Sequence, residues 1–80
     1  MNKSIEVCEV VFVSGEVLER QESEVSGTRP DLLIEKYRTS ILLGLSVITF
    51  TRIFSSNSTR TGLRYTYNPE KDDWGQPDDL

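Results

Sequence analysis

Histidine is absent from this 80-residue chain, and cysteine, methionine and tryptophan occur once each. Without histidine, the chain lacks the commonest general base and the commonest metal ligand of proteins. A single cysteine excludes an intrachain disulfide and a cysteine-based zinc site. No apolar run approaches the roughly 18 residues of a membrane span, and the first six residues lack the apolar core of a signal peptide. The composition therefore predicts a small cytoplasmic protein with no cofactor or metal and no membrane contact.

Catalytic motifs are missing as well. The sequence contains no nucleophile elbow, no phosphate-binding loop and no dinucleotide-binding glycine pattern. Cys8 lies in a valine-rich segment that favours a buried, inert thiol, and no histidine could activate it as a nucleophile. We expect no enzymatic activity and no catalytic residues.

The charged residues fall into three blocks. Residues 1–28 carry six glutamates against two basic residues, a balance of −4. Residues 29–68 have a balance of +4, and residues 69–80 again have −4. Such blocks indicate either solvated faces that interleave in space or surfaces that meet charged partners.

The N-terminal third predicts a β-hairpin. Residues 5–13 are rich in valine, and residues 10–13 are apolar on both faces, as is typical of a strand covered on two sides. Ser14-Gly15 would turn the chain into a second strand over 16–25. This register places Glu9 opposite Arg20 and leaves the polar second strand at an edge.

The middle of the chain predicts one helix followed by a second hairpin. Thr28 is a candidate N-cap for a helix over 29–43 that Gly44 would end. Strands over 47–54 and 59–67 follow, separated by a serine-rich turn. The sequence thus predicts an α+β fold of order ββαββ, in which one helix packs on one face of a small antiparallel sheet.

The last segment differs in composition, so we predict one α+β domain over 1–67 and a flexible acidic tail over 68–80. Two prolines, one glycine and five carboxylates make this tail a poor former of a packed core. Trp74 could pack onto its own domain, dock in a basic groove of a partner, or help the acids to screen the basic hairpin. The partner-docking hypothesis rests on Asp72, Asp73, Trp74, Asp78, Asp79 and Leu80.

Two further surfaces are candidates for binding. Arg52, Arg60 and Arg64 alternate with aromatic residues and could contact the phosphates of a nucleic acid, although Tyr65 and Tyr67 would point to the other face as core. The second surface is a row of acids that could mimic a phosphate backbone, although a solvated edge strand explains it equally. The row comprises Glu16, Glu19, Glu22 and Glu24.

The sequence therefore favours a non-enzymatic protein-interaction module, acting as a regulator, inhibitor or accessory subunit. It would bind a macromolecular partner through a sheet face, a strand edge or the acidic tail. The alternatives are a nucleic-acid-binding hairpin screened by the tail and an acidic phosphate mimic. A homodimer formed by pairing of edge strands is also plausible, because a chain of this size builds only a thin core.

Overall fold

The computed structural model describes residues 3–24, 26–56 and 58–80 of the chain. Within these ranges an antiparallel sheet is combined with two short helices, an α+β arrangement. The elements are β1 (Lys3–Phe12), β2 (Val17–Ser23), α1 (Pro30–Lys36), α2 (Arg38–Leu42), β3 (Ser46–Ser56), β4 (Thr59–Asn68), β5 (Asp73–Trp74) and β6 (Asp78–Asp79). The predicted ββαββ order is wrong, because the helical segment is divided and the last segment adds two short strands.

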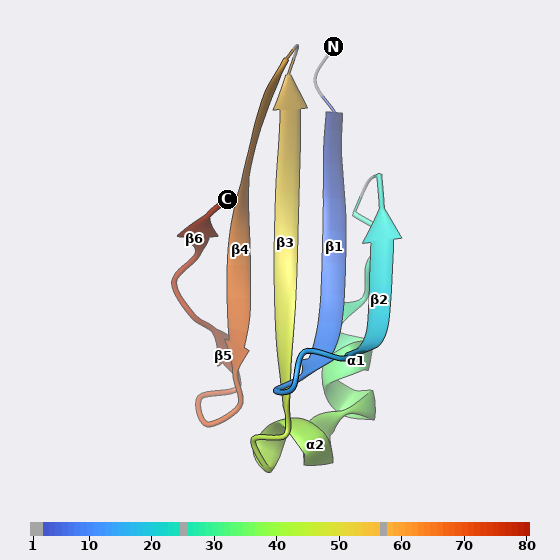
Figure 1. Ribbon diagram of the computed structural model, residues 1–80, viewed down its shortest axis with the longest axis vertical. Helices are drawn as coiled ribbons and strands as arrows, with labels where there is room; N and C mark the ends of the chain where they lie inside the picture. Colours follow the sequence, from blue (N-terminus) through green and yellow to red (C-terminus); the bar gives the residue numbers. More distant parts are fainter. Residues whose placement is uncertain (1–2, 25, 57) are drawn as a thin grey trace.

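The strands lie in the order β2-β1-β3-β4-β5, and β6 also pairs with β4. All neighbours are antiparallel, and β1 and β3 share the longest ladder, from Lys3 opposite Ser55 to Phe12 opposite Ser46. The two hairpins therefore lie side by side with the valine-rich strand inside the sheet. In Figure 1, α1 lies behind β1 and β2, and α2 lies at the lower end of the sheet. Leu33 of α1 and Ile41 of α2 belong to one buried cluster, so the two helices cover the same face.

The first hairpin follows the predicted register away from its turn and departs from it near the turn. Glu9 lies opposite Arg20 as predicted, and their side chains form an ion pair of 3.2 Å. A register shift between Val10 and Val11 then places Val17 opposite Val11. The extra residue is a β-bulge, which increases the local twist of the hairpin.

The predicted helix over 29–43 is interrupted at Tyr37, whose backbone has φ −108° and ψ 16°. The Tyr37 ring packs against the core, and its hydroxyl donates a hydrogen bond of 3.1 Å to Glu19 on β2. Short helices are only marginally stable on their own, so such tertiary contacts decide where they end.

The predicted N-cap is also wrong. Arg29 occupies the cap position of α1, and its side chain makes no capping hydrogen bond to the helix backbone but pairs with Asp31. The Thr28 side chain is instead buried, and its hydroxyl donates a hydrogen bond of 3.4 Å to the Glu6 carboxylate. A buried carboxylate needs hydrogen-bonding partners, and Thr28 supplies one of them.

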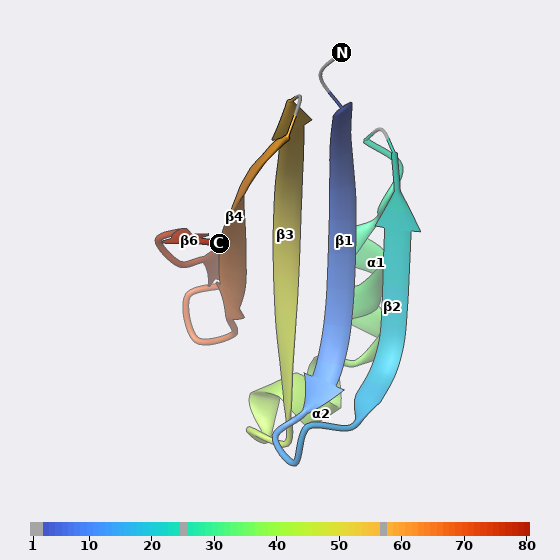
Figure 2. The ribbon, with the colours of Figure 1, turned by 45° about the horizontal axis from the view of Figure 1, so that its top comes forward.

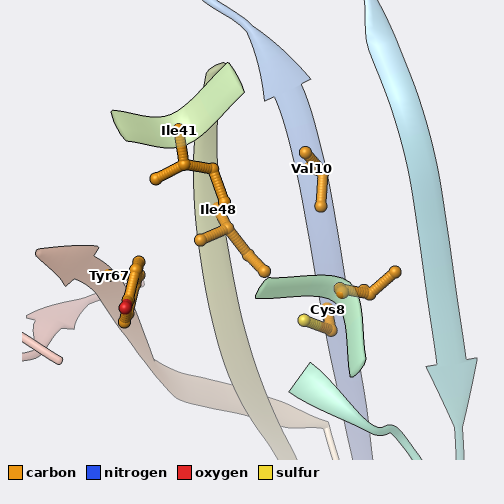
Figure 3. Packing of buried hydrophobic residues seen from close by; sticks show 6 residues of the cluster. Cys8, Val10, Ile41, Ile48 and Tyr67 are labelled. Atoms are coloured by element: carbon orange, nitrogen blue, oxygen red, sulfur yellow. The ribbon is translucent and has the colours of Figure 1, made fainter. Parts of the chain in front are cut away.

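The core lies between the helices and the sheet (Figure 3). Its helical contribution is Leu33 from α1 and Ile41 from α2, and the strands add the rest. Phe50 on β3 and Trp74 on β5 are partly buried and pack against this cluster. The buried cluster comprises Cys8, Val10, Leu33, Ile41, Ile48 and Tyr67.

The C-terminal segment folds back along the outer side of β4, away from α1 (Figure 2). Trp74 lies opposite Tyr67 in the β4–β5 ladder, and Asp78 lies opposite Arg64 in the β4–β6 ladder. Of the three hypotheses for Trp74, the structure shows packing onto its own domain. The mobility expected for residues 68–80 stays a prediction.

Candidate binding face

No helix or strand in the described part of the chain packs on the sheet face turned away from the helices, and we call it the open face. Side chains alternate along a strand, and Cys8 and Val10 point into the core, so Val7, Glu9 and Val11 point to the open face. A hollow of about 580 Å³ lies on it. Its floor is formed by Val7, Val11, Val47, Thr49, Thr51 and Ile53, and its rim includes Glu9, Arg20, Arg60, Arg64 and Leu80.

The floor of the open face is aliphatic and threonine-rich. At its middle, Val7 and Thr51 lie opposite each other, and each is only 8% exposed. The side chains become more exposed towards the end of the sheet that carries the β1–β2 turn, where Val47 is 41% exposed. The exposed apolar side chains of this face gather at that end, where Val13 and Leu45 follow Val47, and apolar side chains exposed together mark an interaction site more often than scattered ones do.

Leu80 joins the open face through a close approach to Gly62. The Leu80 amide donates a hydrogen bond of 3.1 Å to the Gly62 carbonyl. A Cβ atom placed on Gly62 would lie 2.6 Å from Leu80 Cδ1, so the leucine side chain occupies the space that a larger residue would fill. The same Cβ would lie 2.7 Å from the Arg52 backbone oxygen, which cannot move aside as a side chain can, so glycine is required here.

The two sides of the open face carry different charges. On the β4 side, Arg60 and Arg64 make no side-chain hydrogen bond or ion pair with any residue that the structure describes. On the β1–β2 side, Arg20 is held between two acids, at 3.2 Å from Glu9 and 2.9 Å from Glu22. Asp78 on β6 lies next to Arg64, so the β4 side has two basic residues and one acidic residue and is basic overall, whereas the opposite side is acidic overall.

The structure separates the three arginines predicted for nucleic-acid contact. Arg52 lies opposite Leu63 in the β3–β4 ladder, so it points to the face opposite Arg64. There it forms an ion pair of 3.2 Å with the buried Glu6, and its guanidinium lies 5.6 Å from the centre of the Phe50 ring. Only two of the predicted arginines share the open face.

The aromatic residues of the second hairpin follow the predicted alternation. Tyr67 belongs to the buried core, and Tyr65 contacts Phe50 with ring centres 6.4 Å apart. Both lie on the face that bears the helices. Stacking on nucleic-acid bases would require an aromatic side chain beside Arg60 and Arg64. Neither Tyr65 nor Tyr67 lies on the open face with them.

The four acids predicted as a phosphate mimic do not form one row. Glu19 points to the helices, where Lys36 at 2.7 Å and the Tyr37 hydroxyl hold the pKa of this carboxyl below its ordinary value. Glu22 instead lies on the open face with Arg20. Glu16 is exposed in the turn before β2, and Glu24 is exposed just after β2.

Some of the docking residues predicted in the last segment are partly buried or hydrogen-bonded within the domain, and others are exposed. Trp74 is half-buried, with its ring 5.5 Å from that of Tyr67 and 6.2 Å from that of Phe50. Asp72, at φ 50°, accepts a hydrogen bond from the Tyr67 hydroxyl, which raises the pKa of Tyr67. The Trp74 amide donates a hydrogen bond of 2.8 Å to Asp73. Asp78 and Asp79 remain exposed.

The remaining candidate groups offer little chemistry. Cys8 is fully buried, and burial raises the pKa of its thiol to about 11, which disfavours the reactive thiolate. In the described ranges, no three histidine, cysteine, aspartate or glutamate side chains gather as metal ligands. Neither α1 nor α2 is long and apolar enough to cross a membrane.

Comparison with protein-family models, with curated proteins and with solved structures gives no match to this chain. The geometry of the chain is therefore the basis for a function. Sequence reasoning did not identify the floor of the open face as a site. The available signal was the run Val10–Val13, apolar on both faces, which predicted a second covering layer.

Proposed function

We propose that this protein is a non-enzymatic interaction module that binds a protein partner through the open face of its sheet. The observation that carries the proposal is the hollow with a valine and threonine floor and a charged rim. The partner would supply the second layer that the two-sided apolar pattern of β1 requires. Such a module would act as a regulator, an inhibitor or an accessory subunit.

The size of the exposed surface supports a missing layer. The chain exposes 5611 Å², whereas a compact monomer of 9.1 kDa exposes about 4,900 Å². Its radius of gyration is 13.1 Å, against about 11.6 Å for a compact domain of 80 residues. The excess of about 700 Å² is close to the roughly 800 Å² that each partner buries in a standard interface.

Photo-crosslinking tests the proposal directly. A photoreactive amino acid replaces Thr49 on the floor of the open face, or Leu32 on α1 as a control that is exposed and apolar but lies outside the hollow. After irradiation in cells, we expect one discrete protein adduct from position 49 and none from position 32. Equal labelling from both positions, or no adduct from position 49, would refute the proposal.

Nucleic acid is the second candidate, favoured by Arg60 and Arg64 on the open face, which form no ion pair with another described residue. Against it stand the net charge of −4 and the separation of Arg52 from this pair. Titration of fluorescent single- and double-stranded oligonucleotides with the full chain, at low and moderate salt, decides the question. Salt-sensitive binding that Arg64→Glu abolishes would establish this candidate in place of the first.

A further inference from the structure

We infer that the partner on the open face is a second copy of this chain, packed face to face across a two-fold axis parallel to the strands. This inference rests on the proposed function, because it names the occupant of the same face. The dimer would be a β-sandwich of two sheets about 10 Å apart, with the helices on its two outer sides.

Charge complementarity selects this arrangement. The three ladders align Glu22, Val7, Thr51 and Arg64 in one row across the sheet. The row is acidic at Glu22 on β2, uncharged at Val7 and Thr51, and basic at Arg64 on β4, and Asp78 on β6 lies next to Arg64 beyond this end of the row. A two-fold axis above the middle of this row places Arg64 of each copy over Glu22 of the other.

The competing face-to-face arrangement is unfavourable. A two-fold axis lying across the strands would place β4 over β4 and bring the basic sides of the two copies together. Arg60 and Arg64 of one copy would then face the same arginines of the other, and like charges in an interface cost several kcal/mol. In the preferred arrangement, the crossing of the two sheets keeps the charged pairs close. Aligned sheets cross at about 30°. Glu22 and Arg64 lie about 7 Å to either side of the axis, given the spacing of neighbouring strands, so this crossing displaces each Arg64–Glu22 pair by only a few Å.

The exposed apolar residues also favour the axis parallel to the strands. Val13 and Leu45 extend the β1–β3 ladder beyond Val11 and Val47, joined by a backbone hydrogen bond of 3.0 Å. Val13 is 69% exposed and Leu45 is 54% exposed. An axis parallel to the strands brings these ends of the two copies together, whereas an axis across the strands places them at opposite ends.

Edge pairing, the homodimer expected from the sequence, is less favourable at both edges of the sheet. β5 and β6 already pair with the outer side of β4. At the other edge, β2 carries a row of charged side chains, which oppose the approach of an identical strand. The open face offers apolar area without displacing any paired strand.

The experiment uses two variants of the full chain, Arg64→Glu and Glu22→Lys, with sedimentation equilibrium as the measurement. The unmodified chain should sediment as a dimer of twice 9.1 kDa. Each variant alone places two like-charged pairs in the interface, so its self-association should weaken at least about tenfold. An equimolar mixture of the two variants restores both attractive pairs and should form a heterodimer with an affinity close to that of the unmodified chain.

Three controls accompany these variants. Lys71→Glu makes the same charge change as Arg64→Glu at an exposed turn outside the hollow and should leave the dimer intact. Val47→Lys on the exposed end of the floor should yield a monomer. Circular dichroism of every variant verifies that the fold is retained.

The results separate this inference from the proposed function. A folded chain that stays monomeric at about 100 μM, or variants that form no heterodimer on mixing, would overturn the inference. If the Thr49 crosslink then joins a different protein, the proposed function stands with another occupant. If the chain is monomeric and Thr49 gives no adduct, both proposals fail.

Discussion

Replacing Trp74 with alanine should remove a large part of the stability of this domain. The indole packs against the aromatic rings of Tyr67 and Phe50, at 5.5 and 6.2 Å between ring centres, and joins the C-terminal segment to the core. No other tryptophan occurs in the chain, so no neighbouring indole can replace it. The loss therefore includes both the buried area of the ring and two aromatic contacts.

The magnitude follows from these contacts. Replacement of a fully buried tryptophan by alanine costs about 3–5 kcal/mol, and each aromatic pair is worth about 0.5–1.5 kcal/mol beyond its buried area. Because Trp74 is half-buried, we expect a loss of about 2–3 kcal/mol. A domain of 80 residues has a free energy of unfolding of only about 4–12 kcal/mol. The melting temperature should therefore fall by about 10–20 °C.

Urea unfolding monitored by circular dichroism measures this loss without relying on the fluorescence of the removed residue. Trp74→Phe is the control, because it keeps a ring against Tyr67 and should lose less than half as much stability. A loss below about 0.5 kcal/mol for Trp74→Ala would refute the reasoning and would favour the mobile segment expected from the sequence. Amide exchange at Gly75, whose N–H donates to the Thr66 carbonyl at 2.9 Å, is an independent test of that mobility.

Three further results are expected. The Cys8 thiol should react with a disulfide reagent at least about a hundredfold more slowly in the native protein than in urea, because it is fully buried and its pKa is raised to about 11. The hydrogen bond from the Lys36 ammonium lowers the pKa of Glu19 in the folded protein below its ordinary value of 4.5. The pair therefore stabilises the fold above about pH 4.5, and this stabilisation is lost as the pH falls through the pKa of Glu19 in the folded protein. Thermal melts should therefore show a smaller acid-induced loss for Glu19→Gln than for the unmodified chain, and an equal loss would contradict this role. Gly62→Ala would place a Cβ 2.7 Å from the Arg52 backbone oxygen and 2.6 Å from Leu80 Cδ1, so we expect a loss of about 1–3 kcal/mol in urea unfolding, and an unchanged midpoint would contradict this tight backbone packing.

Local patterns predicted much of the fold. The alternation of side chains and the turn residues located both hairpins, and the register predicted from the first turn placed Glu9 opposite Arg20 correctly but missed the shift between Val10 and Val11. The interruption at Tyr37 could not be predicted, because it depends on a contact with β2. The position of Trp74 depends likewise on Phe50, which lies 24 positions earlier in the chain.

The candidate site was less predictable than the fold. A shift of one residue turns a side chain to the opposite face of a sheet, so the separation of Arg52 from Arg64 required the observed β3–β4 register. The apolar run Val10–Val13 did indicate a strand with two apolar faces. This pattern could not indicate that the described helices cover only one of the two faces of the sheet.

The pairing of β5 and β6 with β4 has a consequence for aggregation. An unpaired strand edge is a template on which further chains can add and grow into fibrils. Here the backbone of β4 is already engaged by the Gly75 and Leu80 amides. A mutation that releases the C-terminal segment would therefore expose a strand edge next to an apolar face, and fibril formation would accompany the loss of stability.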